Sequence, residues 1–109
     1  MNYVKIEEGQ KKEIAPGCRA QFVHSGNMTF AYWSLEEGAQ IPEHSHVHEQ
    51  AVNILAGTLE LIVDGETKRL RPGDVVLLPP SVSHSARAVT FCRVLDVFHP
   101  VREDFKASR

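Results

Sequence analysis

The sequence is organised around a histidine-rich stretch, Pro42-Glu43-His44-Ser45-His46-Val47-His48-Glu49-Gln50, which holds three of the six histidines of the chain. In an extended strand, successive side chains point to opposite faces. An extended stretch would therefore project four side chains to one face: His44, His46, His48 and Gln50. Imidazole nitrogen is a favoured ligand for zinc, iron, nickel and copper, and an amide oxygen can complete the shell. The pattern predicts a metal site.

Two simpler interpretations of these histidines are weaker. A single histidine on a strand usually joins a hydrogen bond, but three in alternation are harder to explain in that way. A histidine-rich tract can also be an exposed loop or the remnant of a tag. This tract lies in mid-chain and leads directly into the apolar residues 51–55.

Length and composition indicate one globular domain. The chain has 109 residues, of which 42% are hydrophobic, which is enough to bury a core without disulfides. We expect an N-terminal arm at residues 1–18, which would cover a sheet edge, and a single barrel domain at residues 19–109.

Charge and cysteine usage argue against several classes of protein. The net charge is −2 and no run of Lys or Arg forms a basic patch, so nucleic acid is not an expected partner. No segment reaches the roughly 20 apolar residues of a membrane span, and the charged start lacks the apolar core of a secretory signal. Cys18 and Cys92 do not form a Cys-x-x-Cys pair, so we expect buried, reduced thiols in a cytoplasmic protein.

Short segments with strand character alternate with turn residues along the rest of the chain. Asp64-Gly65 is a strong signal for a tight hairpin. Turns recur about every eight to twelve residues and no βαβ alternation is present, which predicts an all-β sandwich or barrel. The expected strands are residues 19–24, 28–35, 51–55, 58–63, 67–70, 75–78 and 90–98, and only the tail, residues 101–109, has the pattern of a short helix.

Two motifs in the sequence resemble those of the cupin family. The first family motif contains a glycine, a His-x-His pair, an acid and a second glycine, and it is matched here by Gly38, His44, His46 and Gly57, with Gln50 in place of the acid. The second is matched by three residues, Gly73, Pro79 and His84. Ser81 replaces its usual glycine, and Ala88 stands where asparagine is common.

This resemblance covers about residues 38–105. It implies a jelly-roll barrel of short antiparallel strands with one divalent metal ion, such as nickel, zinc, iron or manganese, at its mouth. By position in the motifs, the implied ligands are His44, His46, Gln50 and His84. A neutral glutamine ligand would leave the full metal charge to attract an anionic substrate, which favours carboxylate or enolate binding over redox chemistry. His48 shares the face of these ligands and is either a further ligand or a donor at the rim.

The sequence is similar, more closely, to the KdgF-type cupins of pectin degradation. Residues 94–105 carry this similarity, as does the stretch 44–50 with its glutamine. The resemblance implies conversion of 4,5-unsaturated monouronates, released from pectin or alginate, from the cyclic form to the linear keto acid. It also implies roles beside the metal for Asp96, Phe98 and Arg102.

The residues themselves support these roles in part. Alternation puts Asp96 and Phe98 on one face of the last long strand, together with Cys92 and Val94. If that face is the interior, the carboxyl of Asp96 would have a raised pKa suited to proton transfer. If the other face is the interior, Asp96 pairs with a surface Arg or Lys.

The aromatic and basic residues have simpler interpretations too. Phe98 and Trp33 fit core aromatics, and Arg102 on its own fits a solvated surface charge. With the resemblance, Arg102 would bind a substrate carboxylate by paired hydrogen bonds. Arg87 is a second candidate for that task, or it neutralises a nearby acid.

The leading hypothesis is a metal-dependent isomerase-type enzyme that acts on an unsaturated uronate or a similar small sugar acid. Asp96 would move the proton, Arg102 and His48 would orient the substrate, and Phe98 would pack against its ring and exclude water. One alternative is a small dioxygenase that uses a redox metal and oxygen, and another is a metal-bearing module that binds a small acid without turnover. The resemblance also implies a homodimer.

Overall fold

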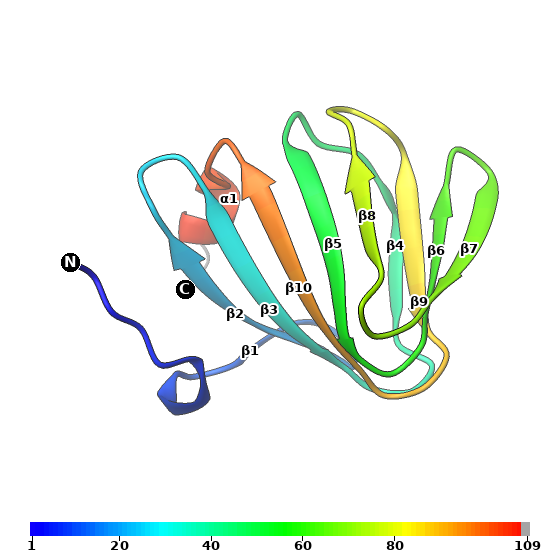
Figure 1. Ribbon diagram of the computed structural model, residues 1–109, viewed down its shortest axis with the longest axis horizontal. Helices are drawn as coiled ribbons and strands as arrows, with labels where there is room; N and C mark the ends of the chain where they lie inside the picture. Colours follow the sequence, from blue (N-terminus) through cyan, green and yellow to red (C-terminus); the bar gives the residue numbers. More distant parts are fainter. Residues whose placement is uncertain (108–109) are drawn as a thin grey trace.

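The computed structural model describes residues 1–107, which fold into two facing antiparallel β-sheets with very little helix (Figure 1). The prediction of an all-β fold is confirmed. The elements are η1 (Ile6–Glu8), β1 (Lys12–Ala15), β2 (Cys18–His24), β3 (Thr29–Leu35), β4 (Gln40–His44), β5 (Glu49–Ala56), β6 (Leu59–Val63), β7 (Glu66–Leu70), β8 (Val75–Leu78), β9 (His84–Ala88), β10 (Cys92–His99) and α1 (Glu103–Ala107).

The strand order places elements far apart in sequence side by side. The larger sheet has the order β1-β2-β3-β10-β5-β8 and the smaller one has the order β4-β9-β6-β7. In the larger sheet β10 therefore lies between β3 and β5, while in the smaller one β9 lies between β4 and β6 (Figure 1). These pairings place β9 beside β4 and β10 beside β5, and β4 and β5 are the two strands that contain the beginning and the end of the histidine-rich stretch.

The histidine-rich stretch is not the continuous strand that the alternation of its residues predicts. β4 ends at His44 in the smaller sheet, β5 begins at Glu49 in the larger sheet, and residues 45–48 cross between them without strand pairing. The prediction of one extended strand with His44, His46, His48 and Gln50 on a single face is therefore wrong. Any convergence of these residues has to come from the crossing between sheets.

The N-terminal segment adds a strand to the edge of the larger sheet. β1 pairs with the first half of β2, with Lys12 opposite Ala20 and Ala15 opposite Cys18. It covers the edge that β2 would otherwise expose, as a protective arm does. The division into an arm of residues 1–18 and a barrel of residues 19–109 stays a prediction.

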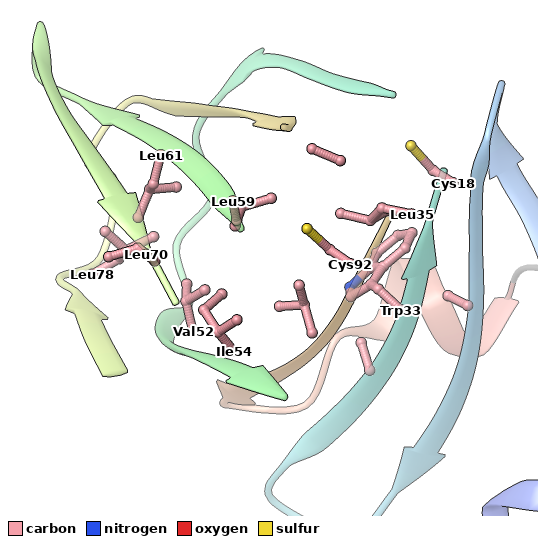
Figure 2. Close-up of a cluster of buried hydrophobic side chains, with 14 of the residues drawn as sticks. Cys18, Trp33, Leu35, Val52, Ile54, Leu59, Leu61, Leu70, Leu78 and Cys92 are labelled. Atoms are coloured by element: carbon pink, nitrogen blue, oxygen red, sulfur yellow. The ribbon is translucent and has the colours of Figure 1, made fainter. Parts of the chain in front are cut away.

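The core fills the space between the two sheets and follows the period of two expected for strands (Figure 2). β10 shows this clearly, because Cys92, Val94, Asp96 and Phe98 are buried while the residues between them are more exposed. Cys18 and Cys92 are buried free thiols, as predicted. The inward positions of the other strands supply the remaining large core side chains, namely Trp33, Leu35, Val52, Ile54, Leu59, Leu61, Leu70 and Leu78.

A short C-terminal helix closes one end of the sandwich. In α1, Phe105 stacks on Phe22 of β2 with the ring centroids 4.5 Å apart. The helix begins soon after Arg102, so this packing also fixes the segment that leaves β10. No helix within residues 1–107 is long and apolar enough to cross a membrane.

Gly57, just after β5, offers a test of close packing against the segment that precedes β10. Its φ is +82°, and a Cβ there would overlap the carbonyl oxygen of Phe91. Gly65 has nearly the same φ, +83°, but a Cβ there meets no atom within 4 Å. We expect Gly65→Ala to cost about 1–2 kcal/mol of unfolding free energy from backbone strain alone, and Gly57→Ala about 1–3 kcal/mol more from overlap.

Urea unfolding of the two variants beside the wild type measures this difference. Because both glycines share a backbone conformation, Gly65→Ala is the matched control for the steric contribution. Equal destabilisation of the two variants would contradict the close approach of Gly57 to the backbone of Phe91, just before β10.

Candidate metal centre

Three histidines from separate segments converge between the two sheets. His44 ends β4 and His84 begins β9, and the two lie directly opposite each other in the strand pairing. Their ring centroids are 4.3 Å apart. His46, in the crossing segment, lies with its centroid 5.1 Å from that of His84. The ligand atoms of the three rings all lie within 4.8 Å of one another, so the group could hold a metal ion.

The backbone fixes which nitrogen of each ring is available. Each Nδ1 faces a carbonyl oxygen nearby in sequence: His44 faces Pro42 at 2.8 Å, His46 faces His48 at 3.1 Å, and His84 faces Val82 at 3.0 Å. Carbonyl oxygen only accepts hydrogen bonds, so each Nδ1 carries the proton and donates it. The Nε2 lone pairs are therefore free for a metal, which is the usual way in which proteins orient histidine ligands.

Gln50 brings an oxygen to this group. From β5, its Oε1 lies 2.9 Å from Nε2 of His46. Because Nδ1 of His46 already holds the ring proton, both facing atoms are acceptors. A positive charge between them, either a second ring proton or a metal cation, would make this contact favourable.

The protonation of the rings favours the metal cation. Burial is the main cause that lowers the pKa of His46 and of His84, which keeps both imidazoles neutral near neutral pH. Nε2 of His84 is buried and accepts no hydrogen bond from any described residue. A buried acceptor of this kind normally has a partner, and a metal ion would supply it. The residues present fit a metal ion.

His48 lies beside this group rather than in it. Its ring centroid is 5.5 Å from that of His46 and 6.3 Å from that of Phe98. The side chain is half-buried, and this burial lowers its pKa. Because the crossing segment turns between His46 and His48, the structure favours the rim position over ligation.

A cavity of about 320 Å³ opens beside the histidines, between the two sheets. Its size is at the lower end of the range for small-molecule sites. Apolar side chains such as Val52, Leu59 and Leu61 line much of its wall. Polar side chains also line the cavity, and they include His44, Gln50, His84, Asp96 and Arg102.

Asp96 projects into this cavity from the middle of β10. Its carboxyl is buried, and Oδ1 has no hydrogen-bond partner in the described part of the chain. Burial raises the pKa of Asp96 to about 7, while hydrogen bonding from the side chains of Gln50 and Trp33 and the charge of Arg102 lower it. Of the two orientations that alternation allows, the inward one is therefore correct.

Arg102 is buried at the end of the cavity, so its interpretation as a solvated surface charge is wrong. The guanidinium donates two hydrogen bonds to Asp104, at 2.9 Å from Nε and 2.7 Å from an NH2 nitrogen. It also lies over two aromatic rings, 4.7 Å from the centroid of Phe98 and 3.9 Å from that of Phe105. The backbone N–H of Arg102 donates to Oγ1 of Thr29 at 2.8 Å. These contacts hold a charged fork in a fixed place.

Sequence reasoning did not identify Asp104 or Thr29, the two residues that hold Arg102. Asp104 stands two residues after Arg102 and carries no motif, although a carboxylate so near an arginine was an available signal. Thr29 is distant in sequence and only the fold brings it close. Arg87, the other arginine considered, pairs instead with Glu60 at 3.4 Å and does not line the cavity.

With this geometry in hand, comparison with known proteins places the chain in a family. Residues 31–98, more than half of the chain, match the Cupin domain family. The chain is a cupin. The jelly-roll architecture expected from its two histidine motifs is thereby confirmed, with His44, His46 and His84 at the positions that the motifs assign to ligands.

Two relatives bear the same name. The pectin degradation protein KdgF of Dickeya dadantii (strain 3937) is 26% identical over 106 residues, which span 94% of this cupin and 96% of that protein. The structure of KdgF from Halomonas sp. has a TM-score of 0.92 at 27% identity, with 96% of this chain and 98% of that chain covered. The resemblance to KdgF is confirmed over nearly the whole length.

A more distant structure shares only the fold. The salicylate 1,2-dioxygenase of Pseudaminobacter salicylatoxidans superposes with a TM-score of 0.77 at 22% identity. The superposition covers 86% of this cupin, which corresponds to 29% of the dioxygenase chain. This likeness shows that the same architecture also occurs within a dioxygenase.

The metal centre can be tested by direct binding. Replacing His84 with alanine removes the buried Nε2 that lacks a partner, and we expect the affinity for Zn²⁺ to fall by at least about 100-fold, measured by isothermal titration calorimetry. His99→Ala is the matched control because His99 is exposed and outside the group. Wild-type affinity and stoichiometry in His84→Ala would show that the ion binds elsewhere.

The burial of Asp96 makes a second prediction, on the stability of the metal-free protein. Its pKa is about 7 when folded and about 3.8 ordinarily, so between these values the folded state holds a proton that the unfolded state releases. The stabilisation that this bound proton provides is therefore fully present below about pH 4, and it is lost as the pH rises to about 7. Asp96→Asn removes this loss and should be more stable than the wild type at pH 8, by about 1.4 kcal/mol for each pKa unit.

Urea unfolding from pH 4 to pH 8 in the presence of a chelator measures this difference. Asp64→Asn, at an exposed turn, is the control and should follow the wild type. A constant difference between Asp96→Asn and the wild type across that range would mean that the carboxyl of Asp96 titrates as it does in water.

Proposed function

We propose that this cupin is a metal-dependent isomerase that converts a 4,5-unsaturated monouronate, or a similar small sugar acid, from the cyclic form to the linear keto acid. One observation carries the proposal: Asp96, a buried carboxyl with a pKa near neutrality, faces the same cavity as the histidine group and Arg102. The similarity to the pectin degradation protein KdgF over nearly the whole chain supports this substrate class.

The proposed metal ligands are His44, His46, Gln50 and His84. Nickel, zinc, iron and manganese all suit imidazole and amide ligands. Such an ion, when bound, supplies Lewis acidity that favours anionic oxygen. Imidazole and amide ligands carry no negative charge of their own, so they do not repel an acidic substrate.

Substrate binding is assigned to Arg102 and Phe98. Arg102 lines the cavity, and two hydrogen bonds to Asp104 fix the orientation of its guanidinium before substrate binds. The remaining N–H groups can then donate to a substrate carboxylate. Phe98 is 3% exposed and its ring packs edge-on to His46 with the centroids 5.5 Å apart. A sugar ring beside Phe98 would be shielded from water next to the histidine group.

The proton transfer is assigned to Asp96. Opening the cyclic uronate breaks the bond between C1 and the ring oxygen, removes the proton of the C1 hydroxyl, and adds a proton at C4 as the C5 ketone forms. The net reaction moves one proton and needs no oxidant. With a pKa of about 7, Asp96 can both accept and donate a proton near neutral pH, which is the property that general acid–base catalysis requires.

Two further expectations stay predictions. The homodimer implied by the resemblance has one feature in its favour, because the edge strand β8 exposes the apolar side chains of Val75 and Leu77. The cytoplasmic location was expected from the composition and the two thiols.

The reaction is tested by the ultraviolet absorbance of 4,5-unsaturated galacturonate, because the conjugated alkene absorbs and the keto product does not. The metal-loaded wild type should remove the absorbance faster than the spontaneous reaction. His84→Ala should remove this acceleration, and Asp96→Asn should lower kcat by about 10²–10⁴-fold while its metal content is unchanged.

A matched pair of arginine variants tests carboxylate binding in the same assay. Arg102→Lys loses the fork and should raise KM by about tenfold or more, whereas Arg87→Lys, on the outer face of the smaller sheet, should leave both constants unchanged. A rate equal to that of the blank across several unsaturated uronates would refute the proposed reaction. Oxygen consumption would then identify a dioxygenase, and ligand binding without turnover would identify a binding module.

A further inference from the structure

The only tryptophan of the chain has a buried N–H without a partner at hydrogen-bond distance among residues 1–107. Trp33 is 8% exposed and projects from β3 into the space between the sheets (Figure 2). Its Nε1–H is buried and donates no hydrogen bond to any atom of residues 1–107. A buried donor without a partner costs about 1–3 kcal/mol, and a buried tryptophan usually satisfies its N–H.

On the neighbouring strand, Asp96 carries a buried acceptor, Oδ1, that also lacks a partner at hydrogen-bond distance among the described residues. In the pairing of β3 with β10, Trp33 lies opposite Val94, and Asp96 lies opposite Ala31. Trp33 and Asp96 are therefore diagonal neighbours on the same inward face, a separation that an aromatic side chain can span. Hydrogen bonding from the indole lowers the pKa of the carboxyl, although neither Nε1 of Trp33 nor Oδ1 of Asp96 has a partner at hydrogen-bond distance among residues 1–107.

Both residues line the same cavity. The indole is held from its other side by Phe22, whose ring meets it edge-on at 6.2 Å between centroids and an interplanar angle of 88°. This packing restricts rotation of the indole away from the cavity. A donor and an acceptor without partners at hydrogen-bond distance thus face one cavity from adjacent strands.

We propose that Trp33 is a substrate-binding residue that donates its Nε1–H to a ligand hydroxyl group, which in turn donates its own hydrogen to Oδ1 of Asp96. A hydroxyl is the simplest group that can accept from one and donate to the other. The cavity then selects an acid that carries a hydroxyl, with Arg102 at the carboxylate and the Trp33–Asp96 pair at the hydroxyl. This inference rests on the proposed function and adds a specificity determinant to it.

The hydroxyl preference gives a binding test that does not depend on turnover. D-Galacturonate and tetrahydropyran-2-carboxylate share a six-membered ring and a carboxylate, but only the first carries hydroxyls. We expect Trp33→Phe, in the zinc-loaded protein, to weaken the binding of galacturonate by about tenfold and to leave the binding of tetrahydropyran-2-carboxylate unchanged, measured by isothermal titration calorimetry.

The affinities for the two acids show whether Trp33 contacts a ligand hydroxyl or only packs in the cavity wall. Equal weakening for both acids would mean that Trp33 only shapes the cavity, and no weakening for either would mean that its N–H contacts solvent alone. Galacturonate that binds the wild type no more tightly than tetrahydropyran-2-carboxylate would also overturn the proposal. Replacement of the single tryptophan by benzothienylalanine, which exchanges the N–H for sulfur in the same ring shape, should repeat the effect of Trp33→Phe without altering the packing.

The wild-type protein supplies a second readout that no folding defect can obscure. Because Trp33 is the only tryptophan, all indole emission comes from this position. Galacturonate should shift that emission and tetrahydropyran-2-carboxylate should not, and the same response to both acids would count against the hydroxyl contact. A hydroxyl-specific response in a protein that fails to isomerise unsaturated uronates would refute the proposed reaction and leave this inference standing.

Discussion

The register of β10 between β3 and β5 controls the chemistry of the interior. In this register Asp96 lies between Ala31 and Val52, and Phe98 lies beside Gln50. Because side chains alternate, a slip of one residue would turn Asp96 and Phe98 outward and place Leu95 and Val97 in the cavity. One strand thus supplies the buried carboxyl, the ring beside His46 and, just beyond its end, the arginine.

The smaller sheet makes the corresponding contribution from the opposite side. β4 and β9 pair so that His44 and His84 face each other, and the crossing segment that follows β4 carries His46 toward Gln50 on β5. The group is therefore assembled from both sheets, and its geometry depends on how the sheets pack. The three backbone carbonyls that accept from Nδ1 each lie two residues from their histidine, so the orientation of each ring is set locally.

Sequence patterns predicted the fold and the candidate site where the signals are local. Alternation identified seven of the strands within a few residues, but β1 and β9 were not assigned, and β4, which contains Pro42 and is mostly exposed, was expected only as part of one strand through the histidine-rich stretch. The two motifs supplied the three histidines and Gln50, which the structure brings together. No local pattern could show that Thr29 would anchor Arg102, because that contact depends on strands distant in sequence. The histidine-rich stretch illustrates the same limit, since its spacing fits a strand while its backbone crosses between sheets.

The unpaired polar atoms connect stability with function in this fold. Four side-chain atoms, namely Nε2 of His84, Oδ1 of Asp96, Nε1 of Trp33 and Nδ1 of His48, are buried without a partner at hydrogen-bond distance within residues 1–107. The rest of the core is a continuous cluster of apolar side chains. The sequence can therefore build an interior without unpaired polar atoms, but it places unpaired polar atoms at these positions. Each such atom lowers the stability of the fold. A metal ion at His84 and an oxygen-rich ligand between Trp33 and Asp96 would supply the missing interactions, so three of the four groups that destabilise the barrel are ones that would bind its ligands.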